Sequence, residues 1–457
     1  MTNPPLPRFP DGFGWGVATS AYQIEGAVHE DGRGVSIWDT FCQQPGKIRG
    51  GQTGEVATDS YHRWREDVAL LAGLGVTAYR FSIAWPRVQP DGTGPAHDAG
   101  LDYYERLADA LLAAGITPVP TLYHWDLPQP LEDAGGWLGR ATAQRFADYA
   151  ALAAARLADR IPLWITLNEP FVVTAFGYAL GIHAPGQALM LDALPTAHHQ
   201  LLGHGLATAA LRAAGARQVM ITNNYSPAWA ASESAADRAA TAAYASLHNW
   251  MFTDPVLLGR YPDLTAFGLA SDGQDPASGL ACVQDGDLAA ISAPVDGIGV
   301  NYYTPTRLSA LPDSPLPFQM QPIAGYPVTS FGWPVVPAGL TEILGQLAAR
   351  YGSALPPLYV TENGCAHEDQ PDSDGTVHDQ FRIDFLDSHL RAVHAAISAG
   401  VDVRGYFHWT LADNFEWTEG YTQRFGLVHV NQASQARTPK SSYAWYRDMI
   451  AAQRGPG

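Results

Sequence analysis

The sequence predicts a (β/α)8 TIM barrel, in which eight parallel strands alternate with helices. Helix-like segments repeatedly end in a glycine and continue directly into an apolar strand, as at Gly75, Gly115, Gly215 and Gly400. Glycine suits the left-handed backbone at a helix C-terminus, and strands that alternate with helices form a parallel sheet. Eight candidate strands in 457 residues fit a closed barrel better than an open sheet.

The candidate strands are short apolar runs near residues 13–19, 77–85, 117–125, 163–169, 218–225, 295–304, 358–362 and 403–411. Many of them contain or end in a polar or aromatic residue, which a strand that only fills a core does not need. Because the C-terminal ends of barrel strands meet at one rim, we expect a pocket there, shaped by long loops and lined by Arg80, His124, Trp125, Glu169, Asn223, Asn301, Tyr303, Glu362 and Trp409.

No linker divides the chain, so we expect a single domain over residues 1–457. The least regular stretch runs from about Thr304 to Pro337, is rich in proline and lacks hydrophobic periodicity. Long loops inside compact domains are usually functional or disordered. Aromatic residues such as Phe331 and Trp333 argue against disorder, so this stretch is expected to be an ordered loop over the pocket.

Charge and composition exclude several classes of partner. The formal net charge is −18 and the isoelectric point is near 5.1, which argues against nucleic acid or an anionic membrane as a partner. No apolar run is long enough to span a bilayer, and no secretory signal is visible. The three cysteines are scattered and form no CxxC pair. A cytoplasmic location is therefore expected.

Two glutamates stand at strand ends in matching contexts. Glu362 lies in LYVTENG (358–364), and Glu169 lies in LWITLNEP (163–170). Hydrolysis of a bond between sugars uses two carboxyl groups, one as the acid and the other as the nucleophile or base. The alternative is that each glutamate pairs with an arginine for structural reasons. The matched contexts favour catalysis.

Seven motifs occur in order along the chain: AYQIEG, YHWDLPQPLEDAGGW, TLNEP, GIHAPG, NYYT, YVTENG and DNFEW. Together they resemble those of family 1 glycoside hydrolases, the family of β-glucosidases and β-galactosidases. The resemblance extends from about Phe9 to Tyr446, nearly the whole chain. It implies a retaining β-glycosidase on a (β/α)8 barrel.

The resemblance also implies roles for individual residues. Glu169 matches the acid/base of the family and Glu362 its nucleophile. Residues that hold the non-reducing sugar are matched by Gln23, His124, Asn168, Glu416 and Trp417, with Trp409 as a floor. Residues around the nucleophile are matched by Arg80, Asn301 and Tyr303. Trp125 and Trp333 are also expected to contact substrate, although the tryptophans and His124 could instead be ordinary core residues.

Chemistry explains why the two carboxyl groups need different environments. An arginine and a tyrosine hydroxyl would keep the nucleophile ionised. Repulsion between carboxylates ~5.5 Å apart is about 3 kcal/mol at an effective dielectric of ~20. That repulsion would raise the pKa of Glu169 from about 4.3 to above 6.

No cofactor is expected. His198, His199 and His204 could suggest a metal, but they lie on a predicted helix without an acidic or cysteine partner at ligand spacing. The alternating Gly12, Gly14 and Gly16 do not form a nucleotide-binding motif.

We expect the chain to be a retaining exo-β-glucosidase that acts on β-glucosides and on short β-linked oligosaccharides such as cellobiose. A role in cellulose degradation is therefore expected. A preference for galactosides or fucosides stays open, and a homo-oligomer is compatible with the sequence. One alternative is a 6-phospho-β-glycosidase, although Glu416 would repel the phosphate. Another is a non-catalytic sugar-binding barrel, although both carboxyl groups are present. Phe171 and Pro334 depart from the family pattern and bear on the leaving-group side.

Overall fold

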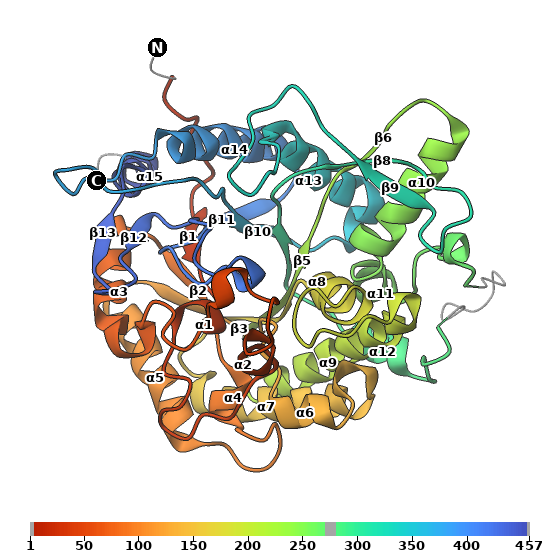
Figure 1. The fold of residues 1–457 in the computed structure, drawn as a ribbon, viewed down its shortest axis with the longest axis horizontal. Coiled ribbons are helices and arrows are strands. Elements are labelled where there is room, and N and C mark those ends of the chain that lie inside the picture. Colours follow the sequence, from red (N-terminus) through yellow and green to blue (C-terminus); the bar gives the residue numbers. More distant parts are fainter. Residues whose placement is uncertain (1–3, 270–279, 455–457) are drawn as a thin grey trace.

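The computed structural model describes residues 4–269 and 280–454, and its centre is a closed barrel of eight parallel strands (Figure 1). The strands run in the order β1-β11-β10-β7-β5-β4-β3-β2 around the barrel. Their bounds are β1 Gly14–Ala18, β2 Ala78–Ser82, β3 Thr117–Tyr123, β4 Leu163–Asn168, β5 Gln218–Asn224, β7 Gly297–Asn301, β10 Leu358–Asn363 and β11 Val403–Trp409. The predicted fold class is confirmed, and each barrel strand coincides with a predicted one.

Helices surround the barrel, as Figure 1 shows. The long ones are α3 Ser60–Leu74, α5 Asp98–Ala113, α7 Ala141–Leu157, α9 Leu194–Ala213, α13 Pro337–Tyr351, α14 Gln380–Ser398 and α15 Ser441–Arg454. Gly75, Gly115, Gly215 and Gly400, which follow four of them, have positive φ angles, as predicted. Among the described residues, no helix combines the length and the apolar character needed to cross a bilayer.

Shorter helices occupy the loops between these elements. They are α1 Ala21–Ile24, α2 Ile37–Cys42, α4 Trp85–Val88, α6 Gln129–Asp133, α8 Pro170–Val172, α10 Ala235–Ala245, α11 Asp254–Leu258 and α12 Asp287–Ile291. A capping box begins α2, because Ser36 and Asp39 each accept a backbone N–H from the other.

Two hydrophobic clusters stabilise the barrel. The larger one contains most of the buried apolar residues. The smaller one is made largely of strand residues, such as Val119, Ile165, Met220 and Phe407. Alternate residues of a barrel strand point inward, so this second cluster fills the interior below the rim. Trp409, at the end of β11, belongs to it and is 3% exposed.

A small second sheet corrects the prediction for residues 304–337. β8 (Thr306–Ala310) pairs in parallel with β6 (Ala228–Ala230) and antiparallel with β9 (Phe318–Gln321). The sheet lies beside α10 in Figure 1, and the backbone N–H of Ala310 donates to Asp237 of that helix at 2.8 Å. The stretch was expected to be an ordered loop without regular structure, so that expectation was wrong for these two strands.

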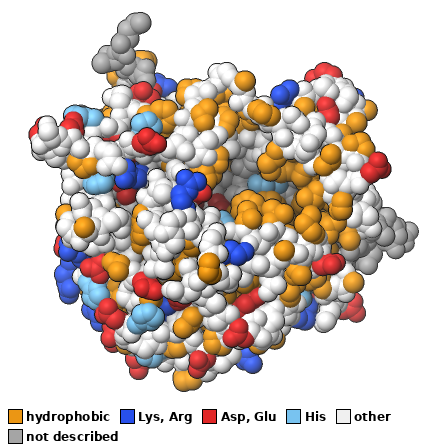
Figure 2. Space-filling view, in the orientation of Figure 1, with side chains coloured by type: hydrophobic (Ala, Val, Ile, Leu, Met, Phe, Trp, Pro, Cys, Tyr) orange, Lys and Arg blue, Asp and Glu red, His pale blue; other side chains and the backbone are white. Residues whose placement is uncertain are grey.

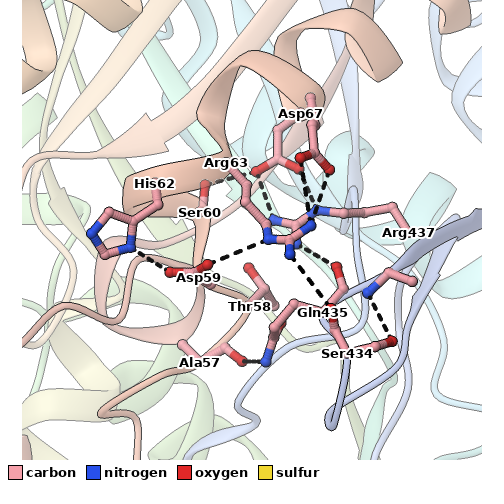
Figure 3. A network of polar contacts seen from close by, with 12 residues as sticks. Ala57, Thr58, Asp59, Ser60, His62, Arg63, Asp67, Ser434, Gln435 and Arg437 are labelled. Carbon is pink, nitrogen blue, oxygen red and sulfur yellow. Dashed lines mark hydrogen bonds and ion pairs between the residues drawn. The ribbon is translucent and has the colours of Figure 1, made fainter.

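The C-terminal hairpin of β12 (Val428–Val430) and β13 (Arg437–Pro439) is tied to α3 (Figure 3). The guanidinium of Arg437 donates to Asp67 at 3.0 Å, and both side chains are largely buried. Gln435 also donates to the carbonyl of Ala57 at 3.5 Å. These contacts fix the segment that follows the long loop after β11.

Candidate active site

The two strand-end glutamates lie at the same rim of the barrel. Glu362 belongs to β10, and Glu169 follows β4, where its backbone N–H donates to the carbonyl of Thr222 in β5 at 2.9 Å. Their exposed fractions are only 3% and 6%. Burial of a carboxyl group disfavours its charge unless partners compensate, so the partners of each glutamate decide its protonation.

Glu362 has the partners of an ionised carboxylate. Arg80, from β2, donates to its Oε1 at 2.6 Å, and the hydroxyl of Tyr303 donates to its Oε2 at 2.8 Å. Arg80 is fully buried, so its charge is poorly screened there. Burial raises the pKa of Glu362, whereas Arg80 and Tyr303 oppose that rise.

Glu169 has no such partners. Its Oε1 accepts one hydrogen bond, from the amide of Asn301 at 2.7 Å. Burial and then the charge of Glu362 raise the pKa of Glu169 to about 8. At neutral pH the proton of the pair therefore belongs on Glu169. The sequence argument explained this rise by repulsion alone, whereas burial is the larger cause.

Asn168 joins the two sides of the pair. Its Oδ1 accepts from Arg80 at 2.5 Å and from Asn301 at 3.1 Å. Its amide nitrogen faces Nε2 of His124 at 3.1 Å. Burial lowers the pKa of His124 well below its usual range, so the ring is neutral. Since Nε2 must accept from the amide, the ring proton lies on Nδ1.

A second polar cluster surrounds Glu416. The amide of Gln23 donates to Oε2 of Glu416 at 3.2 Å, to the carbonyl of Phe415 at 3.0 Å and to Asn414 at 3.2 Å. Ser20 orients Gln23 by donating to its Oε1 at 2.6 Å. Burial, followed by the charge of Glu362, raises the pKa of Glu416 to about 8.

Aromatic rings form the walls between these clusters. The ring centroids of Trp125 and Trp417 are 4.6 Å apart, and His124 stacks at 5.9 Å from Trp417 and 5.8 Å from Trp409. The indole N–H of Trp125 donates to the carbonyl of Asn168 at 2.9 Å. Trp125 and Trp417 have φ angles of 78° and 50°, a conformation that is costly for bulky residues. Such strain is common at functional sites.

These walls enclose a cavity of about 440 Å³. In the space-filling view of Figure 2, the molecule is hollowed near the centre of the face, and hydrophobic side chains gather along one side of the hollow. Ten predicted residues line the cavity: His124, Trp125, Glu169, Asn301, Tyr303, Trp333, Glu362, Trp409, Glu416 and Trp417. Gln23, Asn168 and Arg80 lie behind them and hold them by the hydrogen bonds given above.

Two residues predicted to line the cavity do not line it: Arg80, which lies behind Glu362, and Asn223. The amide of Asn223 turns away, toward the carbonyl of Phe252 at 3.2 Å and the hydroxyl of Thr253 at 3.2 Å. The next residue, Asn224, lines the cavity instead. Successive residues of a strand point to opposite faces, and the sequence did not identify which of the two asparagines faces inward.

Phe331 and Trp333, from the stretch predicted to lie over the pocket, do line the cavity. Sequence reasoning missed other lining residues, among them Val172, Phe176, Ile182, His183, Ser226, Tyr244, His248 and Phe425. Most of these residues come from loops and from α10 or the π-helical turns after α8 and α10. His183 stands in the GIHAPG motif, which was the available signal for that part.

His198, His199 and His204, which the sequence analysis considered as metal ligands, contact other protein groups. His198 interacts with Tyr261 at 2.8 Å and with Asp287 at 2.9 Å, and His204 interacts with Thr166 at 2.7 Å. The acidic partner of His198 is far away in sequence, so spacing alone did not indicate it. Within residues 4–269 and 280–454, no group of three or more His, Cys, Asp or Glu side chains is arranged to hold a metal ion.

Known proteins resemble this chain over nearly its full length. The model of glycosyl hydrolase family 1 matches residues 6–455. Thermostable beta-glucosidase B of Thermobispora bispora is 48% identical over 97% of this chain and 90% of its own. Beta-glucosidase A of Thermotoga maritima is 41% identical over 97% of this chain and 98% of its own.

Solved structures agree with this relationship. The AHE enzyme from Alicyclobacillus herbarius superposes with a TM-score of 0.93 at 44% identity and covers 100% of both chains. The Thermotoga maritima beta-glucosidase in complex with glucoimidazole superposes with a TM-score of 0.92 at 41% identity, covering 98% of this chain and 99% of its own. This chain belongs to glycosyl hydrolase family 1.

Proposed function

We propose that this chain is a retaining exo-β-glucosidase that removes terminal β-D-glucosyl residues through a covalent glycosyl-enzyme intermediate. The observation that carries the proposal is the unequal environment of two buried carboxyl groups. Glu362 contacts Arg80 at 2.6 Å, whereas Glu169 accepts only an amide hydrogen bond at 2.7 Å. One group is therefore suited to attack as an anion and the other to donate a proton.

In the first step, Glu362 attacks the anomeric carbon while Glu169 protonates the departing glycosidic oxygen. A retaining pair needs carboxyl groups about 5–5.5 Å apart, whereas an inverting pair needs about 6.5–9.5 Å. We expect the shorter separation, because Arg80 bonds to both Glu362 and Asn168, the residue before Glu169.

In the second step, Glu169 acts as a base. Esterification of Glu362 removes its negative charge, which is the second-largest cause of the raised pKa of Glu169. The pKa of Glu169 then falls, and the group can take a proton from the attacking water. The same residue can thus serve both steps.

The clamp around Glu416 supports exo-action on an unphosphorylated sugar. Glu416 and His124 line the pocket and offer hydrogen bonds, Gln23 orients Glu416 from behind, and Trp409 offers a flat apolar face. Phe176 and His248 also line the cavity, and we propose that the leaving group lies beside them. We propose β-glucosides and short β-linked oligosaccharides, such as cellobiose released in cellulose degradation, as substrates.

The division of roles between the glutamates can be tested with azide. In Glu362→Gly, azide should enter from the vacated face and give an α-glycosyl azide. In Glu169→Gly, a dinitrophenyl glucoside should still form the intermediate, because its leaving group needs no proton. That intermediate should accumulate, and azide should release it as a β-glycosyl azide. The anomeric proton signal in NMR distinguishes the two products.

The control is Glu55→Gly, which removes an exposed carboxylate outside the cavity and should behave as the wild type. The opposite pairing, with β-azide from the Glu362 variant and α-azide from the Glu169 variant, would reverse the assignment. Unimpaired hydrolysis by both variants would refute the proposed function.

We also propose that the chain works as one domain in the cytoplasm. The free cysteines Cys42, Cys282 and Cys365 support a reducing compartment, because oxidising compartments favour disulfides. Fractionation of the producing cells, with activity assayed in each fraction, tests the location.

A further inference from the structure

Lys440 is one of only two lysines in the chain, and it is buried. It stands between β13 and α15, and its side chain is 0% exposed. Its ammonium donates to Asp369 at 2.9 Å and to Asp413 at 2.8 Å. A lysine is rarely fully buried unless it is paired, so the two carboxylates account for its charge.

Asp413 begins the loop that carries the sugar clamp. Its Oδ1 accepts from Lys440 and also from the backbone N–H of Gly426 at 2.9 Å, so one carboxylate joins the two ends of the segment 413–426. A Cβ added to Gly426 would lie 2.2 Å from the backbone nitrogen of Asp413, which shows how closely these ends approach. Glu416 and Trp417 lie within this closed segment.

The other partner of Lys440 belongs to the segment after β10, the strand of Glu362. Asp369 pairs with Arg382 as well as with Lys440, and its backbone carbonyl accepts from Arg424 at 2.8 Å. Lys440 therefore connects the segment that follows the proposed nucleophile to the loop of the sugar clamp.

The two carboxylates do not depend on Lys440 equally. Asp369 would keep the ion pair with Arg382 if the ammonium were removed. Asp413 would keep the N–H of Gly426, the neighbouring ring of His429, whose Nδ1 lies 3.3 Å from it, and the charge of Arg382 without a direct ion pair to it. A buried carboxylate that loses its cation is strongly disfavoured, so the base of the clamp loop would have to rearrange.

We propose that Lys440 is a positioning residue for the sugar clamp: it sets the position of Glu416 and Trp417 relative to Glu362 by fixing Asp413. This inference rests on the proposed function. On the pocket side the loop is held by Gln23, which donates to Asn414, Phe415 and Glu416. Other contacts hold the segment too, among them the backbone N–H of Asp413 to the carbonyl of Val428 at 2.9 Å and that of Tyr421 to Gln52 at 2.7 Å. Loss of Lys440 would therefore shift the base of the loop without releasing the loop. A displacement of about 1 Å at an active site can reduce the rate by ~100-fold.

The test compares two substrates, so that the amount of folded enzyme cancels. An aryl β-glucoside carries the hydroxymethyl group at the end of the ring proposed to face Glu416, and the matching aryl β-xyloside lacks it. In Lys440→Met, kcat/KM should fall more for the glucoside than for the xyloside. We expect the ratio of the two values to decrease at least fivefold from its wild-type value.

Arg437→Met is the matched control. Arg437 lies three residues before Lys440 and is part of a largely buried ion pair, but its partner Asp67 belongs to α3 (Figure 3) and not to the loop of the clamp. This variant should lose stability and keep the wild-type ratio. The double variant Asp413→Asn/Lys440→Met should recover part of the ratio, because a neutral amide needs no cation.

Each outcome either supports or overturns the proposal that Lys440 positions the sugar clamp. A wild-type ratio in Lys440→Met would make the lysine merely structural and would overturn the proposal. If that variant does not fold, Asp413→Ala alone serves, because it removes the acceptor of Lys440 in the loop and keeps the pair between Lys440 and Asp369; a lowered ratio supports the proposal, and an unchanged one overturns it. A wild-type enzyme that cleaves neither glycoside would refute the proposed function and this inference together.

Discussion

At the scale of single residues, three buried carboxyl groups face the same cavity. Glu169, Glu362 and Glu416 all have raised pKa values, and only Glu362 contacts Arg80. The charge of Glu416 is one of the causes that raise the pKa of Glu169. The residue proposed to hold the sugar therefore also affects the protonation of the proposed acid.

Replacing Glu416 by Gln should move the upper limb of the pH–rate profile. The proposed acid must be protonated, so kcat/KM should fall as pH rises through the pKa of Glu169, about 8. Because Gln carries no charge, this limb should shift to lower pH in Glu416→Gln. Initial rates on an aryl glucoside between pH 5 and 10 measure the shift, with Glu55→Gln as control. A limb at the same pH in both variants would show that Glu416 does not act on Glu169.

Replacing Glu416 by Ser should weaken the sugar clamp. Above its pKa of about 8, for example at pH 8.5, Glu416 is ionised and is expected to accept hydrogen bonds from hydroxyls at the far end of the ring. A hydrogen bond to a charged group contributes about 1.5–3 kcal/mol. Glu416→Ser should therefore lower kcat/KM on an aryl β-glucoside at least tenfold. It should also improve the relative rate on the 6-phosphorylated analogue, because the carboxylate no longer repels phosphate. Unchanged kinetics on both substrates would show that Glu416 does not bind the sugar.

At the scale of elements, the pocket floor depends on the close approach of β10 and β11. These strands pair in parallel, and Gly364 follows β10 beside the end of β11. A Cβ at Gly364 would lie 1.9 Å from the carbonyl oxygen of Trp409. The clashing oxygen belongs to the backbone, so it cannot move aside as the end of a flexible side chain could. A residue larger than glycine must therefore push the two strand ends apart.

Gly364→Ala should therefore reduce both stability and kcat/KM, since it displaces Trp409 relative to Glu362. Gly345→Ala is the control, because a Cβ there meets nothing within 4 Å and lies in α13. In a helix this control should be neutral or stabilising by about 0.5–1 kcal/mol. Thermal unfolding and initial rates measure both effects. Wild-type activity in Gly364→Ala would show that the floor tolerates the displacement.

The sequence predicted the barrel better than the second sheet, and the reason is physical. Each barrel strand is an apolar run. Four of these strands follow a helix and a glycine, so the same helix–glycine–strand pattern repeats along the sequence. β8 and β9 have five and four residues, and β9 is largely half-buried or exposed, so neither shows a strong period. β8 pairs with β6, which lies 78 residues earlier in the chain, and such long-range pairings leave no local signal.

Side chains at the site were predictable to the extent that motifs identify them. Most of the proposed residues line the cavity, while Gln23, Asn168 and Arg80 support it from behind. The inward residue of the pair Asn223–Asn224 depends on strand register, which a hydrophobic run does not fix. Lys440 gave no signal either, because its partners Asp369 and Asp413 come from two separate loops.

At the scale of the whole molecule, buried groups of two kinds make stability depend on pH in opposite directions. Burial lowers the pKa of His183, His204, His248 and His408 to about 3, against an ordinary value of 6.5. Between these values the unfolded chain binds more protons, so stability rises with pH. Above pH 6.5 both states leave these histidines neutral, and their contribution becomes constant.

Two buried carboxyl groups change the stability in the opposite direction, over the pH range from 4.5 to 8. Glu169 and Glu416 have folded pKa values of about 8 against an ordinary 4.5, so between these values the folded chain binds more protons than the unfolded one. Their contribution to stability therefore decreases as pH rises from 4.5 to 8. Above pH 6.5 the decrease is no longer offset by the buried histidines, and wild-type Tm should fall between pH 7 and 8.5.

Glu169→Gln and Glu416→Gln should each reduce this fall, because a neutral amide has no proton to lose. At pH 5 the wild-type groups are themselves protonated, so each variant should resemble the wild type more closely there than at pH 8.5. Calorimetric Tm values at both pH values measure the difference, with Glu55→Gln as the control that keeps the wild-type slope. Parallel Tm curves for the wild type and both site variants would show that Glu169 and Glu416 are ionised in the folded enzyme at neutral pH. In that case Glu169 would not carry the proton that the proposed acid must donate, and the roles assigned to Glu169 and Glu362 would be contradicted.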